Sequence, residues 1–392
     1  MRISTSSIYN ANVSVLNLQQ AQLQHTQLQV ATGRRMLTPS DDPAASARAL
    51  EVIQSDSTNT QFATNRLAVK NTAALSDGIL QGVTELLQEV RTRVVEGSGN
   101  PTAAQKQMMA TEFGGRLEEL MGLANSTDGI GNYLYSGFQG STKPFSNTAA
   151  GAQYNGDDGQ RLVQADSSRK IAASDSGADI FMRIKNGNGT FVVQAGAANA
   201  GSGMVSQGNV TNPALLTGNN YTVTFGGVPG AITYSVPGAT PALVNLPYVS
   251  GQAISFDGMQ FAVTGAPVAG DVVTVAPSQN ESIFKTMSDL IVAMGTSGTQ
   301  YSNSLSQAIN NLDRDLNNVL SVRGSLGNRL NEIDALQTTG DNLGLTFKAT
   351  LSQLQDLDYN KGISDLNLQQ LSLQAAQKSF KQVSDLSLFN YI

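Results

Sequence analysis

The two ends of the chain carry the same short motif and the same apolar repeat. LNLQQ stands at residues 16–20 and again at 366–370 of the 392 residues. In both copies apolar residues recur every seven positions, a spacing typical of a helix that packs along another helix. Ordering a residue costs about 1 to 2 kcal/mol and a buried leucine returns roughly 1.5 to 3 kcal/mol, so such a sparse stripe does not keep a lone helix folded.

We therefore predict that the two ends form helices that share one packed environment. The apolar positions are predicted to form an assembly seam, which consists of Leu16, Leu23, Val30, Leu366, Leu373, Ala376, Phe380 and Val383.

The N-terminal end is also free of charge. No Asp, Glu, Lys or Arg stands between Arg2 and Arg34, where glutamine is frequent. In a polymer of identical subunits a charge lies near copies of itself, and like charges at close quarters repel each other. An uncharged polar surface avoids that repulsion. A disordered glutamine-rich tail is the alternative interpretation, and the regular apolar spacing argues against it.

A second helix is predicted to start shortly after the first one ends. In TPSDDPAASARAL, residues 38–50, Asp42 suits the N-cap and Pro43 suits the first helical position. Two adjacent aspartates could instead hold a metal ion, but no third ligand type stands nearby. Apolar stripes at helical spacing follow in residues 75–94, 109–124 and 305–336, which predicts long amphipathic helices in a bundle.

The middle of the chain has a different character. Residues 141–280 hold half of the glycines and most of the prolines, and residues 186–256 contain no charged side chain. The segments YTVTF, AITYSV, AISFDGMQFAV and DVVTV alternate polar and apolar residues, as strands do, and are separated by turn-forming residues. An inserted all-β domain is predicted here.

These patterns predict an α+β fold, in which a long helical coiled-coil bundle is built from both termini and an all-β domain is inserted in the middle. The predicted divisions are a terminal coiled-coil domain of residues 1–41 and 341–392, a helical bundle domain of 42–140 and 281–340, and an outer β-rich domain of 141–280.

The sequence offers little material for catalysis or for cofactor binding. Cysteine is absent and His25, in the uncharged N-terminal helix, is the only histidine, so metal sites of the His/Cys type and Ser/His/Asp triads are not expected. A net charge of −6 gives no basic surplus for nucleic acid. No secretory signal or membrane span is evident. A glycosidase pair among Asp157, Asp158, Asp257 and Asp271 stays an open alternative.

Several segments together resemble the flagellin superfamily. They are MRISTSSIY at the start, TGRRMLTPSDDPAASARAL at residues 32–50, GNYLYSGFQGSTKPF at 131–145, GDVVTVAPSQNESIF at 270–284 and the C-terminal stretch from DLDYNKGISDLNLQQ at 356 to the end. The resemblance covers most of the helical portions, whereas residues 150–250 carry no motif of the superfamily. The loop after the first helix and the C-terminal ending resemble the hook-associated members more than flagellin itself.

The resemblance implies a structural role. In this superfamily helices from both chain ends form the inner core of a tubular polymer, and the middle projects outward. A hook-associated member implies a mechanical adaptor without cofactor, which self-associates at the hook–filament junction, contacts the first hook-associated protein and flagellin, and is exported to the cell exterior with the help of an export chaperone. A flagellin-type filament subunit and a secreted β-rich adhesin are the alternatives.

Overall fold

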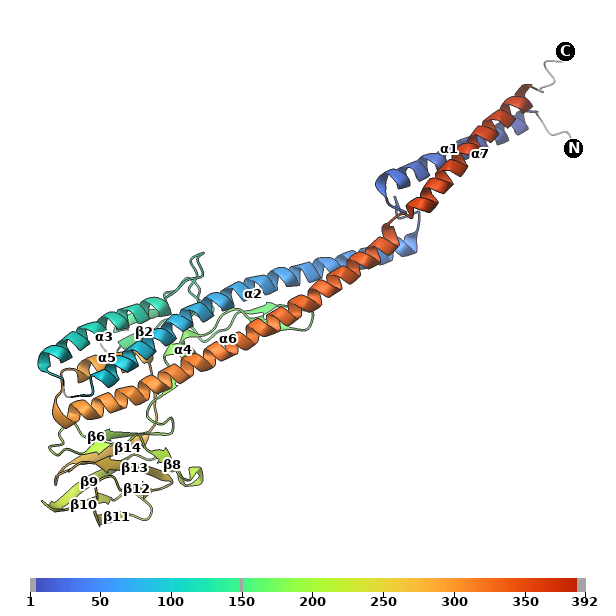
Figure 1. Cartoon of the computed structure of the whole chain (residues 1–392). Coiled ribbons are helices and arrows are strands. Elements are labelled where there is room, and N and C mark those ends of the chain that lie inside the picture. The colour runs from blue at the N-terminus through green and yellow to red at the C-terminus, as the bar shows by residue number, and fades with distance from the viewer. Residues whose placement is uncertain (1–4, 100, 149–150, 386–392) are drawn as a thin grey trace. The chain divides into compact units, whose positions relative to one another are not determined.

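The computed structural model describes residues 5–99, 101–148 and 151–385. It divides into two compact units (Figure 1). Unit 1 comprises residues 1–64 and 335–392, and unit 2 comprises residues 65–334. The α+β class predicted from the sequence is confirmed, with long helices toward both ends of the chain and a β module in the middle.

The secondary-structure elements described in unit 1 are all helices. This unit holds α1 (Thr5–Thr32), α7 (Tyr359–Asp385), the first part of α2 (Pro43–Glu96) and the last part of α6 (Gly298–Gln355). Helices α1 and α7 lie side by side and antiparallel (Figure 1). Within this unit Asn59 Nδ2 donates to the carbonyl of Gly340 at 2.8 Å and joins α2 to α6.

The helical part of unit 2 contains α3 (Ala103–Ala124), α5 (Ile283–Ala293) and the remaining lengths of α2 and α6. Their apolar stripes meet in one core, as the 3.6-residue periodicity of the sequence requires. A capping box of Thr102 and Gln105 starts α3. Ion pairs such as Arg91–Asp313 and Lys70–Asp334 link α2 to α6, which run antiparallel.

Short elements between α3 and the β module also pack on this helical core. They are β1 (Phe145–Thr148), β2 (Gly151–Tyr154), β3 (Leu162–Gln164), β4 (Lys170–Ala172), α4 (Gly177–Phe181) and β5 (Ile184–Lys185), which pairs with β15 (Asn280–Glu281). The rings of Phe145, Phe181 and Phe284 touch one another inside the core. Part of the segment predicted as β-rich therefore belongs to the helical core.

The β module has a core of its own, which runs from Phe191 to Val275. One sheet has the order β11-β10-β9-β14-β6 and another has the order β12-β13-β7, with β8 also pairing with β13. The strands are β6 (Phe191–Ala195), β7 (Met204–Val205), β8 (Asn209–Val210), β9 (Tyr221–Val228), β10 (Ala231–Val236), β11 (Leu243–Pro247), β12 (Ala253–Phe256), β13 (Met259–Thr264) and β14 (Val272–Pro277). Burial alternates along β9, as the polar and apolar alternation of YTVTF predicts. The three-domain division proposed from the sequence stays a prediction about independently folding parts.

Candidate functional site: an assembly surface

The predicted seam residues lie along the contact between α1 and α7. Leu16, Leu23, Val30, Leu366, Leu373, Ala376 and Phe380 are all partly buried, whereas neighbours in the same helices are exposed. The rings of Tyr9 and Phe380 approach to 5.3 Å between centroids. Val383 lies in α7, but its side chain is outside the part of the chain whose side chains the structure describes.

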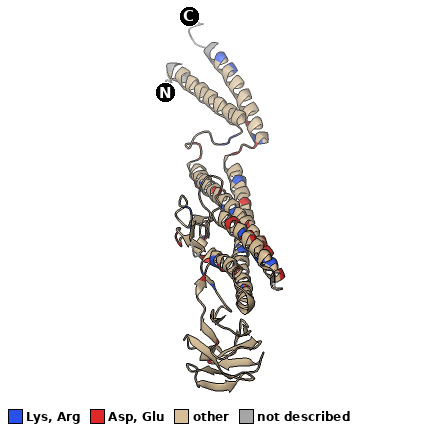
Figure 2. Cartoon of the chain, turned by 90° about the vertical axis from the view of Figure 1, so that its left-hand side faces the viewer, with Lys and Arg blue, Asp and Glu red and all other residues tan. Residues whose placement is uncertain are grey.

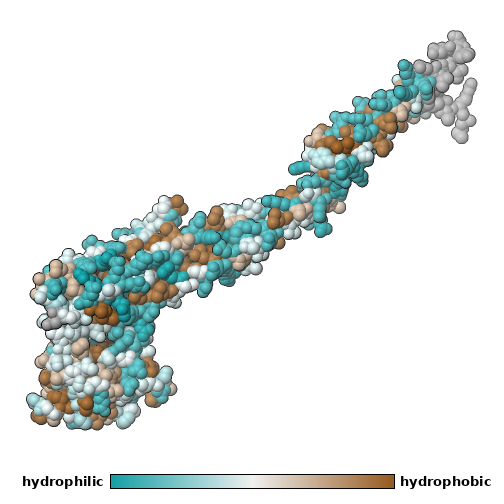
Figure 3. Space-filling model, viewed as in Figure 1, coloured by the Kyte–Doolittle hydropathy of each residue, from teal (hydrophilic) through white to brown (hydrophobic). Residues whose placement is uncertain are grey.

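A second apolar stripe lies on the outer faces of the same two helices. Leu18 and Leu28 of α1 and Leu368 and Leu371 of α7 are exposed, with Leu371 at 67%. Figure 3 shows apolar patches on the surface of these helices. The α1–α7 pair therefore has apolar side chains on its outside that no other described element covers.

The surface charge is distributed unevenly. Figure 2 shows no charged residue on α1 and a β module that is almost free of charge, while most acidic and basic residues lie on the other helices. Absence of charge on α1 removes a source of repulsion between copies brought close together.

The Asp41 carboxylate fixes part of the loop between α1 and α2. Asp41 accepts hydrogen bonds from the backbone N–H of Leu37 at 2.8 Å and of Thr38 at 2.9 Å. Its other oxygen lies 3.2 Å from His25 Nε2. The hydrogen bonds from Thr38 and Leu37 lower the pKa of Asp41 to about 2. The single histidine therefore contacts a loop-fixing carboxylate.

Asp42 and Pro43 stand where α2 begins. Asp42 Oδ1 accepts a hydrogen bond from the backbone N–H of Ala45 at 3.0 Å, three residues further on, as an N-cap side chain does. Pro43 is the first residue of α2, where its missing N–H costs nothing.

Replacing Asp41 with alanine is expected to loosen this loop. Because the folded pKa is depressed, the carboxylate stabilises the loop above the ordinary value of 3.8, and this contribution is lost as the pH falls through about 2. Amide NMR signals of Leu37 and Thr38 should titrate with a midpoint near 2 in the wild type and should not titrate in Asp41→Ala. Ser40→Ala, which leaves the carboxylate in place, is the control, and a wild-type midpoint near the ordinary value would contradict the assignment.

An apolar groove, for which the sequence gives no local signal, lies in unit 1 between this loop and α2. It is lined by Met36 and Leu37 of the loop and by Leu50 and Ile53 of α2, among others, and its volume is about 560 Å³. Arg34 is also among the residues that line it.

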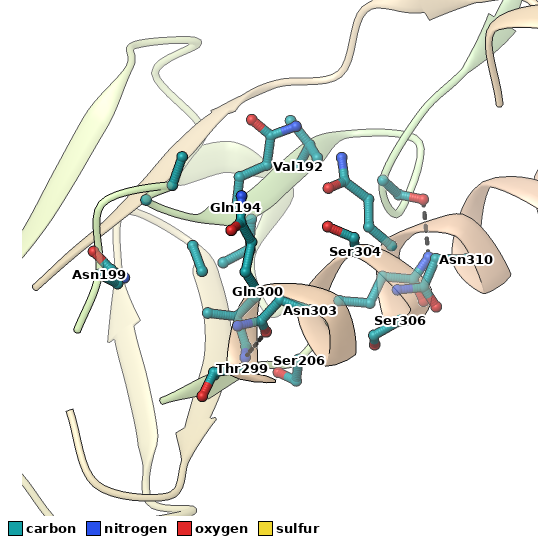
Figure 4. Close-up of a pocket in the computed structure, with 18 of the residues that line it drawn as sticks. Val192, Gln194, Asn199, Ser206, Thr299, Gln300, Asn303, Ser304, Ser306 and Asn310 are labelled. Carbon is teal, nitrogen blue, oxygen red and sulfur yellow. Dashed lines mark hydrogen bonds between the residues drawn. The ribbon is translucent and has the colours of Figure 1, made fainter. Parts of the chain in front are cut away.

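A polar cavity of about 260 Å³ lies in unit 2 between the start of α6 and β6 (Figure 4). Amide and hydroxyl side chains such as Gln194, Gln300 and Ser304 line it, and the described lining residues include no titratable side chain. Asn303 accepts from the N–H of Val205 and donates to the carbonyl of Gly203, both at 3.0 Å. The cavity therefore belongs to a polar, uncharged contact between the β module and α6.

The four carboxylates of the glycosidase alternative each hold a loop or an ion pair. Asp157 accepts from the N–H groups of Phe138 and Gly159, Asp158 pairs with Arg183, Asp257 accepts from Thr240, and Asp271 accepts from Ala200 and Val268. In the described ranges there is no group of three or more His, Asp or Glu side chains that could bind a metal ion. Nor does a helix among those ranges have the length and apolar character to cross a membrane.

Comparisons with known proteins agree on one family. The family model for the bacterial flagellin N-terminal helical region matches residues 3–140. The flagellar hook-associated protein 3 of Salmonella typhimurium is 29% identical over 390 residues, which cover 99% of each chain. The crystal structure of flagellar hook-associated protein 3 from Legionella pneumophila is 31% identical, with a TM-score of 0.73 over 77% of this chain and 98% of that chain. A structure of the flagellar junction protein FlgL from the same organism is 31% identical, with a TM-score of 0.71 over 79% and 100% of the two chains.

Proposed function

Because this chain belongs to the flagellar hook-associated protein 3 family, whose members are structural proteins of the flagellum and not enzymes, we propose that it is a secreted adaptor of the hook–filament junction. In this proposal copies of the chain assemble through their terminal helices into a short ring. The ring joins the first hook-associated protein on the hook side to flagellin on the filament side. A flagellar export chaperone escorts the chain before assembly.

The pair of terminal helices supports this proposal most directly, because it has apolar residues both inside the pair and on its outside. One stripe of each helix is used inside the pair, and a second stripe, with Leu18, Leu28, Leu368 and Leu371, faces outward. A helix pair that served only its own monomer would need one stripe. The outward stripe and the absence of charge on α1 are what contact between identical copies requires.

Electron microscopy of flagella from a strain that lacks this chain tests the proposal. We expect hooks without filaments and flagellin released into the medium, and we expect the wild-type chain to restore attached filaments. Immunogold labelling of the restored flagella should mark a single point where hook and filament meet.

The alternatives give different results in the same experiment. A filament subunit would be labelled along the whole filament. An adhesin would leave filaments attached in the strain that lacks it. Either result would exclude the junction function.

A further inference from the structure

Ile130 is the most exposed large apolar side chain among the described residues, with 85% of its surface accessible. It stands on a tight turn of unit 2. Asp128 accepts hydrogen bonds from the N–H of Ile130 at 3.1 Å, the N–H of Asn132 at 3.0 Å and Asn132 Nδ2 at 3.0 Å. The turn therefore holds the isoleucine outward in a fixed conformation.

The glycines on both sides of Ile130 show that the turn projects into open space. Gly129 and Gly131 have φ angles of 81° and 100°, and no atom lies within 4 Å of the position that a Cβ would take at either residue. Fixing an apolar side chain before it binds reduces the conformational entropy lost on binding. Such a side chain has the properties of an interface anchor.

The groove of unit 1 has the matching apolar chemistry. Its walls are Met36, Leu37, Leu50 and Ile53, and Leu50 is 68% exposed. The hydrogen bonds of Asp41 fix one wall of the groove, because they hold the backbone N–H of Leu37. This wall of the groove is therefore held in place before a partner binds, as is the turn that carries Ile130.

The charges beside the two features are opposite. Arg34, which lines the groove, makes no ion pair with a described residue, and its guanidinium donates no hydrogen bond to one. Asp128, at the base of the turn, makes no ion pair within the described ranges either. Burial acts to raise the pKa of Asp128, but the hydrogen bonds from Asn132 and Ile130 outweigh it and hold the pKa below its usual value, so the group is charged at neutral pH.

We infer that Ile130 of one copy of the chain inserts into the apolar groove of a second copy, with Asp128 of the first facing Arg34 of the second. The inference rests on the proposed function, since it names a contact through which copies assemble. Each copy carries both halves, so the contact is head-to-tail and repeats from copy to copy, as a ring or helical polymer requires. One apolar anchor is too little to hold two free subunits together, and we expect the contact only in the assembled state.

The absence of cysteine from the chain makes cross-linking a clean test. The full chain carrying Ile130→Cys and Leu50→Cys is expressed in a strain that lacks the native copy. Flagella with attached filaments are isolated and treated with a short bifunctional maleimide. We expect a ladder of covalent multimers beyond the dimer, at least tenfold above the level in either single variant. Met108→Cys with Leu50→Cys is the matched control, because Met108 is 64% exposed on the same unit, and it should give no ladder.

Only monomers in flagella that keep their filaments would overturn the contact and leave the junction function standing. Filaments that remain attached in the strain without the chain would instead overturn the junction function. If the double variant is exported but sheds its filaments, filament attachment is compared between the single variants Ile130→Leu and Ile130→Asp. Attachment with leucine and at least a tenfold loss with aspartate supports the contact, and equal attachment with both overturns it.

Discussion

Leu373→Asp is expected to abolish filament attachment while the purified monomer melts at an unchanged temperature. Leu373 is partly buried against α1, and no described side chain of α1 or α7 belongs to either of the two hydrophobic cores. Because so sparse an apolar stripe does not keep a helix folded by itself, we expect this contact to form only on assembly. Every assembled copy would then lose roughly 1.5 to 3 kcal/mol of apolar burial and would also bear the cost of placing a carboxylate in an apolar contact. Circular dichroism of the monomer on heating and flagellin recovered from the culture medium are the two measurements.

Two further substitutions test whether the effect belongs to the seam. Leu16→Asp should behave like Leu373→Asp, because both leucines are partly buried seam residues of the α1–α7 pair. Gln374→Glu adds a charge at the neighbouring, exposed position of α7 and should be milder. Full attachment with Leu373→Asp, or a monomer that melts far below the wild type, would show that the residue does not act through assembly.

The sequence was informative where one periodic signal decides the structure. Seven-residue spacing placed Leu16 and Leu373 on one face of their helices, and that face is the one that packs. Alternation did the same for β9, whose Tyr221, Val223 and Phe225 are buried. Both signals work because side-chain direction follows from the backbone period alone.

The sequence did not predict the structure where long-range contacts determine which core a segment joins. Residues 145–185 contain strands of two to four residues, which are too short to show a period. Phe145 and Phe181 join the helical core through ring contacts with Phe284, more than 100 residues away. Glycine and turn residues made this segment look like part of the β module, and only packing assigns it to the helices.

The candidate assembly surface also has one part that the sequence predicts and one part that it does not. The paired seam follows from periodicity, but the groove needs a loop folded back on α2, which no local pattern encodes. The exposure of Ile130 could have been predicted from the sequence. The run Asp-Gly-Ile-Gly favours a turn, and an isoleucine in such a turn lies outside any helix or strand that could bury it.

The second large effect that we expect is on stability, and it comes from Asp315, a buried carboxyl group in the helical core. Asp315 of α6 is 2% exposed, and its Oδ2 has no hydrogen-bond partner among the described residues. Burial raises its pKa well above the ordinary value of 3.8, nearby Glu281 raises it further, and a hydrogen bond with Thr286 opposes both. Burial also raises the pKa of Glu281. The folded chain therefore holds protons that the unfolded chain releases.

The sign of the pH dependence follows from this. Because the folded pKa is raised, the contribution of Asp315 to stability is greatest in acid and declines as the pH rises above the ordinary value of 3.8. We expect Asp315→Asn, which can keep the hydrogen bond with Thr286 without a charge, to raise the free energy of unfolding at pH 7 by about 1 to 3 kcal/mol. The decline in stability between about pH 4 and pH 7 should become shallower, with Glu281 supplying what remains.

Asp313→Asn is the control for that measurement. Asp313 lies two residues earlier on α6, is partly exposed and pairs with Arg91 at 2.5 Å. Removing it should destabilise the chain by up to about 1 kcal/mol, opposite in sign to Asp315→Asn. Unfolding in urea across this pH range measures both variants. An Asp315→Asn protein that is less stable than the wild type at pH 7 would mean that the buried carboxylate is paired and stabilising in the native core, and that the charge it carries is part of what holds α5 and α6 together.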